Sequence, residues 1–173
     1  MDLTAKYEKG GFYLWATFSN AYVNRFDGVE TYATNFDRRN NINLLGNYAF
    51  GDKKSWEFSV RWNYGSGFPF TLTQGFYSNF NFKDGINTDV LTGNPGLGII
   101  YSSKRNGGRL PDYHRLDASL KKMISFTKYI KMEIVASVTN AYDRKNIFYF
   151  DRVRFTRVDQ LPILPSLAAT LHF

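Results

Sequence analysis

The sequence predicts an all-β protein whose strands form an antiparallel up-and-down sheet, as in a segment of a membrane-spanning β-barrel. Three observations support this prediction. Several stretches alternate apolar and polar residues with a period of two, which is the spacing of the two faces of a strand. Aromatic residues make up 18% of the chain although its mean hydropathy is only -0.37. The connections between the alternating stretches are short and long in turn.

The amino-terminal part of the chain gives two strands. Residues 3–8 alternate weakly, and Lys9-Gly10-Gly11 then supplies a tight turn, because glycine tolerates positive φ. Residues 12–24 predict a longer strand with apolar residues on both faces, so the side that would face lipid stays open. Residues 25–39 contain Asp27-Gly28 and many polar residues, which predicts a loop.

Two further strands follow, joined by the polar turn 51–55. Residues 40–50 alternate, and residues 56–65 alternate without exception, with charges only at Glu57 and Arg61. A charged side chain at the bilayer midplane would cost about 2–4 kcal/mol, so this pattern fits a strand between lipid and a wet lumen. A soluble sheet whose polar face meets water explains this strand equally well.

Residues 66–112 have no periodicity and are far more numerous than the residues of an ordinary loop. Long loops of this kind are functional or disordered, but aromatic residues are too frequent here for a disordered segment. They are Phe68, Phe70, Phe76, Tyr77, Phe80 and Phe82. We therefore expect much of this loop to be ordered.

The next part of the chain gives two strands and a small hairpin. Residues 114–121 and 132–139 alternate, and the turn between them is placed at 123–130. After a break at 142–146, the segments 147–150 and 153–158 predict a hairpin around Asp151-Arg152.

The last strand covers residues 166–173, and Pro162 and Pro165 before it indicate a strand entry because proline has no amide donor. Leu167, Ala169, Leu171 and Phe173 share one face. Two interpretations are open. The strand closes an outer-membrane barrel and its terminal aromatic is recognised by the barrel-assembly machinery, or it is the terminal strand of a soluble sheet.

The lengths of the connections separate these fold classes best. They are short after residues 8, 50 and 121 and long after residues 24, 65 and 140. Short turns at one end and long loops at the other are typical of outer-membrane barrels. A soluble sandwich has no reason to follow this rule.

Composition limits the function. No stretch reaches the about 18 apolar residues of a membrane-spanning helix, and the start has no apolar signal-peptide core. The chain has no cysteine, which excludes disulfides, thiolate metal sites and cysteine nucleophiles. The net charge is +7, but the basic residues are scattered, so we expect no nucleic-acid partner. A basic surface beside lipid phosphates is equally consistent.

No motif predicts catalysis, a metal site or a cofactor, and we expect the chain not to be an enzyme. Residues 93–98 are glycine-rich but lack the Lys-Ser/Thr pair of a phosphate loop. His114 and His172 lie in different strands, so nothing assigns them to one metal.

Three separated motifs resemble one known family. They run from Trp62 to Thr71, from Arg109 to Asp117 and from Gln160 to Leu167. In this order they are similar to the carboxy-terminal barrel strands of TonB-dependent outer-membrane transporters, particularly those of Bacteroidetes. The resemblance covers essentially the whole chain.

The resemblance implies that residues 1–173 are the carboxy-terminal part of a receptor barrel in the bacterial outer membrane. Such barrels have about 22 strands and a plugged lumen, so about seven strands form part of the wall and the plug domain is absent. The implied function is uptake of a scarce solute such as a siderophore, cofactor, glycan or peptide. The implied partners are the rest of the barrel and its plug, the TonB complex, the barrel-assembly machinery, lipopolysaccharide and a surface lipoprotein.

Three sets of candidate residues follow. The cargo set in the long loop is Phe68, Phe70, Tyr77, Phe80, Lys104, Arg105 and Arg109. The assembly-signal set is Leu167, Ala169, Leu171 and Phe173. The membrane-interface set is Trp15, Trp56, Trp62, Tyr64 and Tyr113. For each loop aromatic, packing of the loop is the competing explanation, and a soluble all-β module binding carbohydrate or protein is the alternative function.

Overall fold

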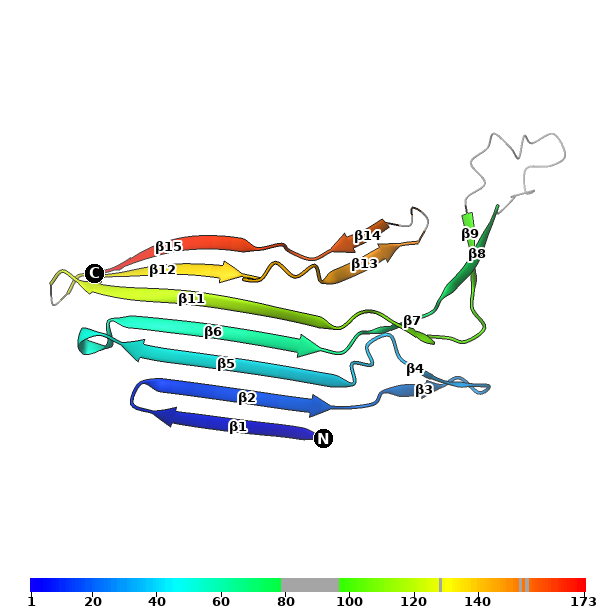
Figure 1. Cartoon of the computed structure of the whole chain (residues 1–173), viewed down its shortest axis with the longest axis horizontal. Coiled ribbons are helices and arrows are strands. Elements are labelled where there is room, and N and C mark those ends of the chain that lie inside the picture. The colour runs from blue at the N-terminus through cyan, green and yellow to red at the C-terminus, as the bar shows by residue number, and fades with distance from the viewer. Residues whose placement is uncertain (79–96, 128, 153, 155) are drawn as a thin grey trace.

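The computed structural model describes residues 1–78, 97–127, 129–152, 154 and 156–173, and these form one open sheet with loops at one end (Figure 1). The described residues contain no α-helix, only the 3-10 turn η1 (Asp52–Lys54). In spatial order the seven strands of the sheet are β1 (Asp2–Lys9), β2 (Phe12–Asn20), β5 (Asn40–Phe50), β6 (Trp56–Gly65), β11 (Tyr113–Ser125), β12 (Lys131–Thr139) and β15 (Leu164–His172).

All neighbouring strands of this sheet are antiparallel, and each pairs with the sheet strands before and after it in the chain. The predicted all-β, up-and-down architecture is therefore confirmed. The sheet is not closed, because β1 and β15 lie at its two edges (Figure 1). Its strands β2, β5, β6, β12 and β15 have 9, 11, 10, 9 and 9 residues.

The short turns lie together at one end of the sheet, which we call the turn end (Figure 1). They join β1 to β2, β5 to β6 and β11 to β12, and the carboxy terminus lies beside them. In the first turn Gly10 and Gly11 have φ of 64° and 98°, the left-handed region that glycine adopts without strain.

The long connections form a loop layer at the opposite end, which comprises the described residues of 21–39, 66–112 and 140–163. Four two-stranded ladders order it. They are β3 (Asn24–Phe26) with β4 (Thr31–Ala33), β7 (Pro69–Phe70) with β10 (Gly108–Arg109), β8 (Thr73–Ser78) with β9 (Leu97–Tyr101), and β13 (Ile147–Asp151) with β14 (Thr156–Asp159). Order is thus confirmed for 66–78 and 97–112, while Phe80 and Phe82 lie outside the described residues.

The last strand begins at Leu164, two residues before its predicted start, and includes Pro165. Two other predicted boundaries differ more. The strand predicted over 12–24 ends at Asn20, because the Asn20 side chain bonds to the carbonyl of Arg39 and the side chain of Asn40 and so turns the chain away. The turn predicted over 123–130 begins too early, since β11 continues to Ser125. Met123 still donates its amide to the carbonyl of Ser55, which keeps the strand within the sheet.

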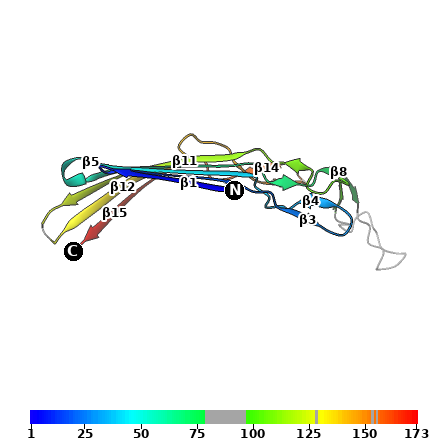
Figure 2. The ribbon, with the colours of Figure 1, turned by 90° about the horizontal axis from the view of Figure 1, so that it is seen from below.

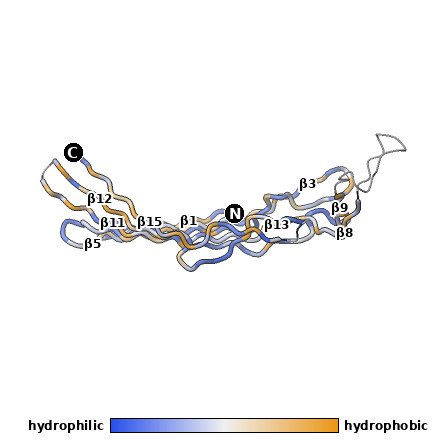
Figure 3. Tube along the Cα trace, turned by 90° about the horizontal axis from the view of Figure 1, so that it is seen from above, coloured by the Kyte–Doolittle hydropathy of each residue, from blue (hydrophilic) through white to orange (hydrophobic). Residues whose placement is uncertain are grey.

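The register gives the sheet two chemically different faces. Residues directly opposite one another in neighbouring strands point to the same side. One row across the sheet contains Phe12, Tyr48, Phe58, Leu120, Ala136 and Leu167. The adjacent row, on the other side, contains Tyr13, Asn47, Ser59, Ser119, Ser137 and Ser166. We call these the apolar face and the polar face, and Figure 3 shows the alternation along the strands.

The sheet has no hydrophobic core on either face. Seen edge-on it is a single twisted layer (Figure 2), and none of the described apolar side chains is fully buried. On the apolar face Phe58 remains 44% exposed and Leu120 38% exposed. An apolar surface of this extent indicates contact with a membrane or with another protein.

Candidate functional site

Aromatic rings mark the turn end of the apolar face. Tyr7, Phe12, Tyr48, Phe50 and Trp56 follow one another across four strands, with successive ring centroids 6.2, 6.3, 5.6 and 6.2 Å apart. The ring of Trp56 also carries the ammonium of Lys122, 4.4 Å from its centroid. Rings with an adjacent cation suit a boundary between an apolar medium and water.

A second aromatic cluster lies at the loop end of the same face. Trp62 stacks on Tyr64 and contacts His114, with centroids 6.0 and 6.5 Å apart. Tyr142 of the loop layer lies 2.6 Å from the Nδ1 atom of His114. Between the two clusters the apolar face carries mainly small and aliphatic side chains, such as Leu14, Leu44, Val60, Leu116 and Ala118. The apolar face is therefore bounded by rings at both ends along β6, from Trp56 to Tyr64.

The membrane-interface set divides between the two faces. Trp56, Trp62 and Tyr64 lie on the apolar face, in or beside the two aromatic clusters. Trp15 lies on the polar face, opposite Lys6 and Leu45. Tyr113 also lies on the polar face, opposite Gly65. Trp15 and Tyr113 therefore do not join the other three.

The polar face carries amides and ion pairs. Asn63 donates to the side chain of Asn43, which itself donates to Thr17 Oγ1 at 3.3 Å. Further along the strands, Lys121 Nζ lies 2.6 Å from a carboxylate oxygen of Glu57. Arg115 Nη2 lies 2.9 Å from Asp117. This face suits water or a polar partner.

Asp37 is the electrostatic centre of the loop layer. Its side chain is only 1% exposed and accepts hydrogen bonds from the Val23 amide, at 2.9 Å, and from Arg109 Nη2. Arg109 Nη1 also donates to the carbonyl oxygens of Asp37 and Gly67, at 3.1 and 3.0 Å. Burial opposes ionisation of the Asp37 carboxyl, but the Val23 amide and the Arg109 guanidinium outweigh it and lower its pKa. This network joins residues 21–39 to residues 66–112.

Arg38 fills the space beside the Asp37 network. Its guanidinium lies over the rings of Phe68 and Tyr113, 4.3 and 5.4 Å from their centroids. Burial of this cation lowers its pKa below the ordinary value. A Cβ atom at Gly65 would overlap the same guanidinium, so the absence of a side chain at Gly65 allows Arg38 to pack against β6.

Asp112 connects the loop layer to the aromatic cluster at the loop end. It accepts a hydrogen bond from the Tyr64 hydroxyl at 2.7 Å and another from the Gly67 amide at 3.0 Å. These two donors, the Tyr64 hydroxyl first, lower the pKa of the Asp112 carboxyl. The side chain of Asp112 therefore fixes where β6 leaves the sheet.

Two buried asparagines shape the connection from β12 to β15. Asn140 donates from Nδ2 to the carbonyls of Arg144 and Leu161, at 3.0 and 3.1 Å. Asn146 pairs with the backbone of His114, donating to its carbonyl and accepting from its amide. The segment from β12 to β15 has little regular structure, so its backbone groups need other hydrogen-bond partners. The side chains of Asn140 and Asn146 are such partners.

Gly67→Ala is expected to destabilise the loop layer by about 1–3 kcal/mol. An added Cβ atom would overlap the carbonyl oxygen of Leu110, which lies beside the β7–β10 ladder. Trypsin cleavage after Lys104 or Arg105 should become faster. Gly75→Ala is the matched control, since the nearest atom of the described residues to its Cβ would be Ile100 Cδ1, at 3.9 Å. Equal cleavage of both variants would contradict close packing at Gly67.

Two adjoining cavities lie in the loop layer. An apolar cavity of about 850 Å³ is formed between the β7–β8 segment and the β13 strand. A polar cavity of about 510 Å³ is formed between β7 and residues 101–106. Phe70 and Arg152 line both cavities, so they form the wall between them. A volume of 300–1,000 Å³ is usual for small-molecule sites.

The described members of the predicted cargo set lie at three different places. Phe70 lines both cavities, and Arg105 lines the polar one while it pairs with Asp27 at 3.2 Å. Phe68 and Arg109 belong instead to the packing around Arg38 and Asp37. Tyr77 and Lys104 are exposed and line neither cavity, and Phe80 lies outside the described residues.

The cavity residues outside the long loop were not among the candidates predicted from the sequence. Phe148, Phe150 and Arg152 line the apolar cavity although they follow the long loop by some 40 residues. The hairpin predicted around Asp151-Arg152 was the available signal. That prediction places Phe148 and Phe150 in the first strand of the hairpin and Arg152 at its tip. It does not indicate which residues of other segments lie beside them.

The assembly-signal set lies on the apolar face of the edge strand. Ala169 and Leu171 are opposite Ile134 and Met132 of β12, and Leu167 is opposite Ala136. Phe173 follows the strand at the turn end and is 98% exposed.

Among the described residues no group of acidic or histidine side chains is placed to hold a metal ion. No helix within the described ranges is long and apolar enough to cross a membrane.

Comparison of the chain with protein-family models, with curated proteins and with solved structures gave no match. We therefore infer the function from the chemistry of the two faces and of the loop layer.

Proposed function

We propose that the chain forms part of the wall and the outer loops of an energy-coupled transporter of the bacterial outer membrane, of the TonB-dependent type. The apolar face contacts lipid, the polar face lines the lumen, and the loop layer meets the cargo outside the cell. The chain carries no chemistry of its own in this role. Its function is uptake of a solute that is too large and too scarce for simple pores.

The observation that carries this proposal is the uncovered apolar face with aromatic rings at both ends. From Trp56 to Tyr64, β6 rises about 26 Å at the usual rise of a strand. The apolar band of outer-membrane barrels is about 25 Å tall and is flanked by aromatic girdles. Strands of 9–11 residues, as in β2, β5, β6, β12 and β15, are long enough to cross it when tilted.

The two open edges indicate the first partner. In lipid each unpaired backbone group of β1 or β15 would cost several kcal/mol. Further strands of the same barrel must therefore pair with both edges, in a wall of about 22 strands around a plug. The remaining proposed partners are the TonB complex, the barrel-assembly machinery, lipopolysaccharide and a surface lipoprotein.

The location of the full-length protein tests this proposal. We expect it in the outer-membrane fraction, resistant to an alkaline wash and released only by detergent. Recovery from the aqueous phase without detergent would contradict it and would favour the alternative, a soluble all-β module that binds carbohydrate or protein.

Removal or substitution of Phe173 tests the assembly role of the last strand. Deletion of Phe173, or Phe173→Ala, is expected to lower the amount of protein in the outer membrane several-fold. The ring is exposed beyond β15 and loses no packing within the described chain. Quantitative immunoblotting of outer membranes measures the effect, with Phe126→Ala in an exposed part of the neighbouring turn as the control. Normal amounts of both Phe173 variants would restrict Phe173 to a packing role.

A further inference from the structure

We infer that the two adjoining cavities of the loop layer form one binding site for a small amphipathic organic anion, with an aromatic or branched apolar body and an acidic head. The inference rests on the proposed function, because it treats the loop layer as the part that meets cargo. It names the chemical class of that cargo from the cavity walls.

The apolar cavity fits the body of such a ligand. Its walls include Phe70, Phe76, Leu110, Phe148 and Phe150. Aromatic rings from two separate segments of the chain thus face one space of about 850 Å³. Flat or branched apolar groups gain both burial and ring contacts in such surroundings.

Arg152 provides the charge for the head group. Its Nη1 atom donates to the carbonyl of Thr71 and to Thr73 Oγ1, at 3.0 and 3.3 Å, and its guanidinium lies 5.2 Å from the ring centroid of Tyr101. These partners are neutral and hold the side chain in place. A guanidinium has five N–H donors in a planar fork, so further donors can bind a carboxylate or sulfonate.

The neighbouring arginines, Arg105 and Arg154, are paired with carboxylates, whereas Arg152 is held by neutral groups. Asp151 also lines the apolar cavity, but its carboxylate accepts the Arg154 amide at 3.0 Å and pairs with Arg154 Nε at 3.9 Å. In the polar cavity Arg105 is paired with Asp27, and the carboxylate of Glu30 also lines this cavity near Arg105. Arg152 is therefore the cation in the wall shared by the two cavities, with an apolar space on one side and a polar one on the other.

The test compares 2-naphthoate with its uncharged counterpart 2-naphthamide. Both are titrated calorimetrically into the full-length protein in lipid nanodiscs, and empty nanodiscs correct for uptake by lipid. We expect naphthoate to bind about tenfold more tightly than the amide, as a hydrogen-bonded charge pair implies. Arg152→Gln should remove this preference and leave the affinity for the amide within about twofold.

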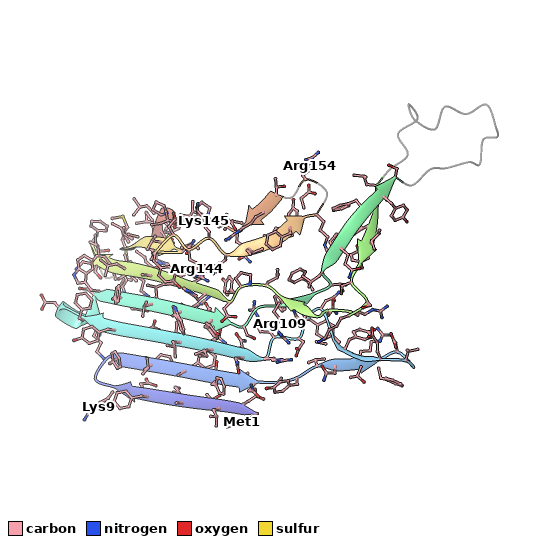
Figure 4. All side chains as sticks on the ribbon, turned by 45° about the vertical axis from the view of Figure 1, so that its right-hand side comes forward. Met1, Lys9, Arg109, Arg144, Lys145 and Arg154 are labelled. Carbon is pink, nitrogen blue, oxygen red and sulfur yellow. The ribbon has the colours of Figure 1, made fainter. Side chains whose placement is uncertain are left out.

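Two further variants make the result specific. Arg154→Gln is the matched control, because Arg154 is on the same hairpin, is 82% exposed and extends from its tip (Figure 4). It should keep the preference. Phe150→Ala should weaken both ligands. Equal affinity of the native protein for the two ligands, a preference retained in Arg152→Gln, or no binding by protein recovered from the outer membrane would each overturn the inference. If the protein is recovered from the outer membrane but binds neither ligand, the transporter proposal still holds. If the protein is recovered in the aqueous phase, the transporter proposal is contradicted.

Discussion

Phe58→Arg is expected to remove most of the protein from the outer membrane, whereas Ser59→Arg is expected to leave its amount unchanged. The two residues are adjacent in β6 but point to opposite faces. Phe58 lies between Tyr48 and Leu120 on the apolar face, one row in from Trp56 at the turn end. An arginine on the lipid face costs about 2–4 kcal/mol at the bilayer midplane and less towards the interfaces. Even a loss of about 1–2 kcal/mol is a large part of the stability of an ordinary domain.

Ser59 has polar neighbours on both sides, Asn47 and Ser119. An arginine at this position can remain solvated in a wet lumen, and Arg61 shows that the strand already carries one on this side. The amount of each variant in washed outer membranes, relative to the native protein, measures the difference. Equal losses would mean that the two faces have been assigned to the wrong surroundings.

Asp37→Ala is expected to lower the free energy of unfolding of the loop layer by about 3–5 kcal/mol. This is the usual effect of removing one partner of a buried ion pair. It would leave the guanidinium of Arg109 without its carboxylate and the amide of Val23 without its acceptor. Hydrogen exchange should become faster together in residues 21–39, 66–78 and 97–112, because Arg109 joins these segments through Asp37 and Gly67. Exchange in β5 and β6 should stay slow.

Asp27→Ala is the matched control for this prediction. Asp27 also pairs with an arginine, Arg105, but both side chains are partly exposed. Such surface pairs contribute about 0–1 kcal/mol. Exchange should therefore become faster only at the amides of Val29 and Glu30, which donate to Asp27 Oδ1, and should hardly change in the rest of the loop layer. If the two variants had the same effect, Asp37 would not be the centre of the loop layer.

The pKa of Asp37 gives this network a pH dependence. Its folded-state pKa is lowered from the ordinary value of 3.8. The stabilisation is therefore complete above the unfolded-state pKa and is lost as the pH falls through the lower folded-state pKa. The loop layer should remain ordered at pH 5 and open in stronger acid before the strands do.

Residues 40–50 and 56–65 show what could be predicted from the sequence. Their limits agree with β5 and β6 at both ends, because each strand alternates without a break and is bounded by a polar turn or a glycine. The ends of β2 and β11 were missed for a different reason. They depend on Asn20 and Met123 bonding to residues of other segments, and local alternation carries no such information.

The loop layer was less predictable than the sheet. Its central pair, Asp37 and Arg109, is separated by 72 positions, and no periodic pattern connects them. The same holds for the cavity wall, where Phe70 and Arg152 come from different loops. The aromatic content of residues 66–112 correctly indicated order, but only the fold shows which rings pack around Arg38 and which face a cavity.

A nitroxide scan along β6 tests the central claim most directly, that the apolar face contacts lipid and the polar face contacts water. The chain has no cysteine, so a single cysteine placed at each position from Glu57 to Asn63 carries the only label. Collisions with lipid-soluble oxygen should be highest at positions 58, 60 and 62, and collisions with a water-soluble nickel complex highest at 57, 59, 61 and 63. High nickel accessibility at positions 58, 60 and 62 in the membrane-embedded protein would contradict the account.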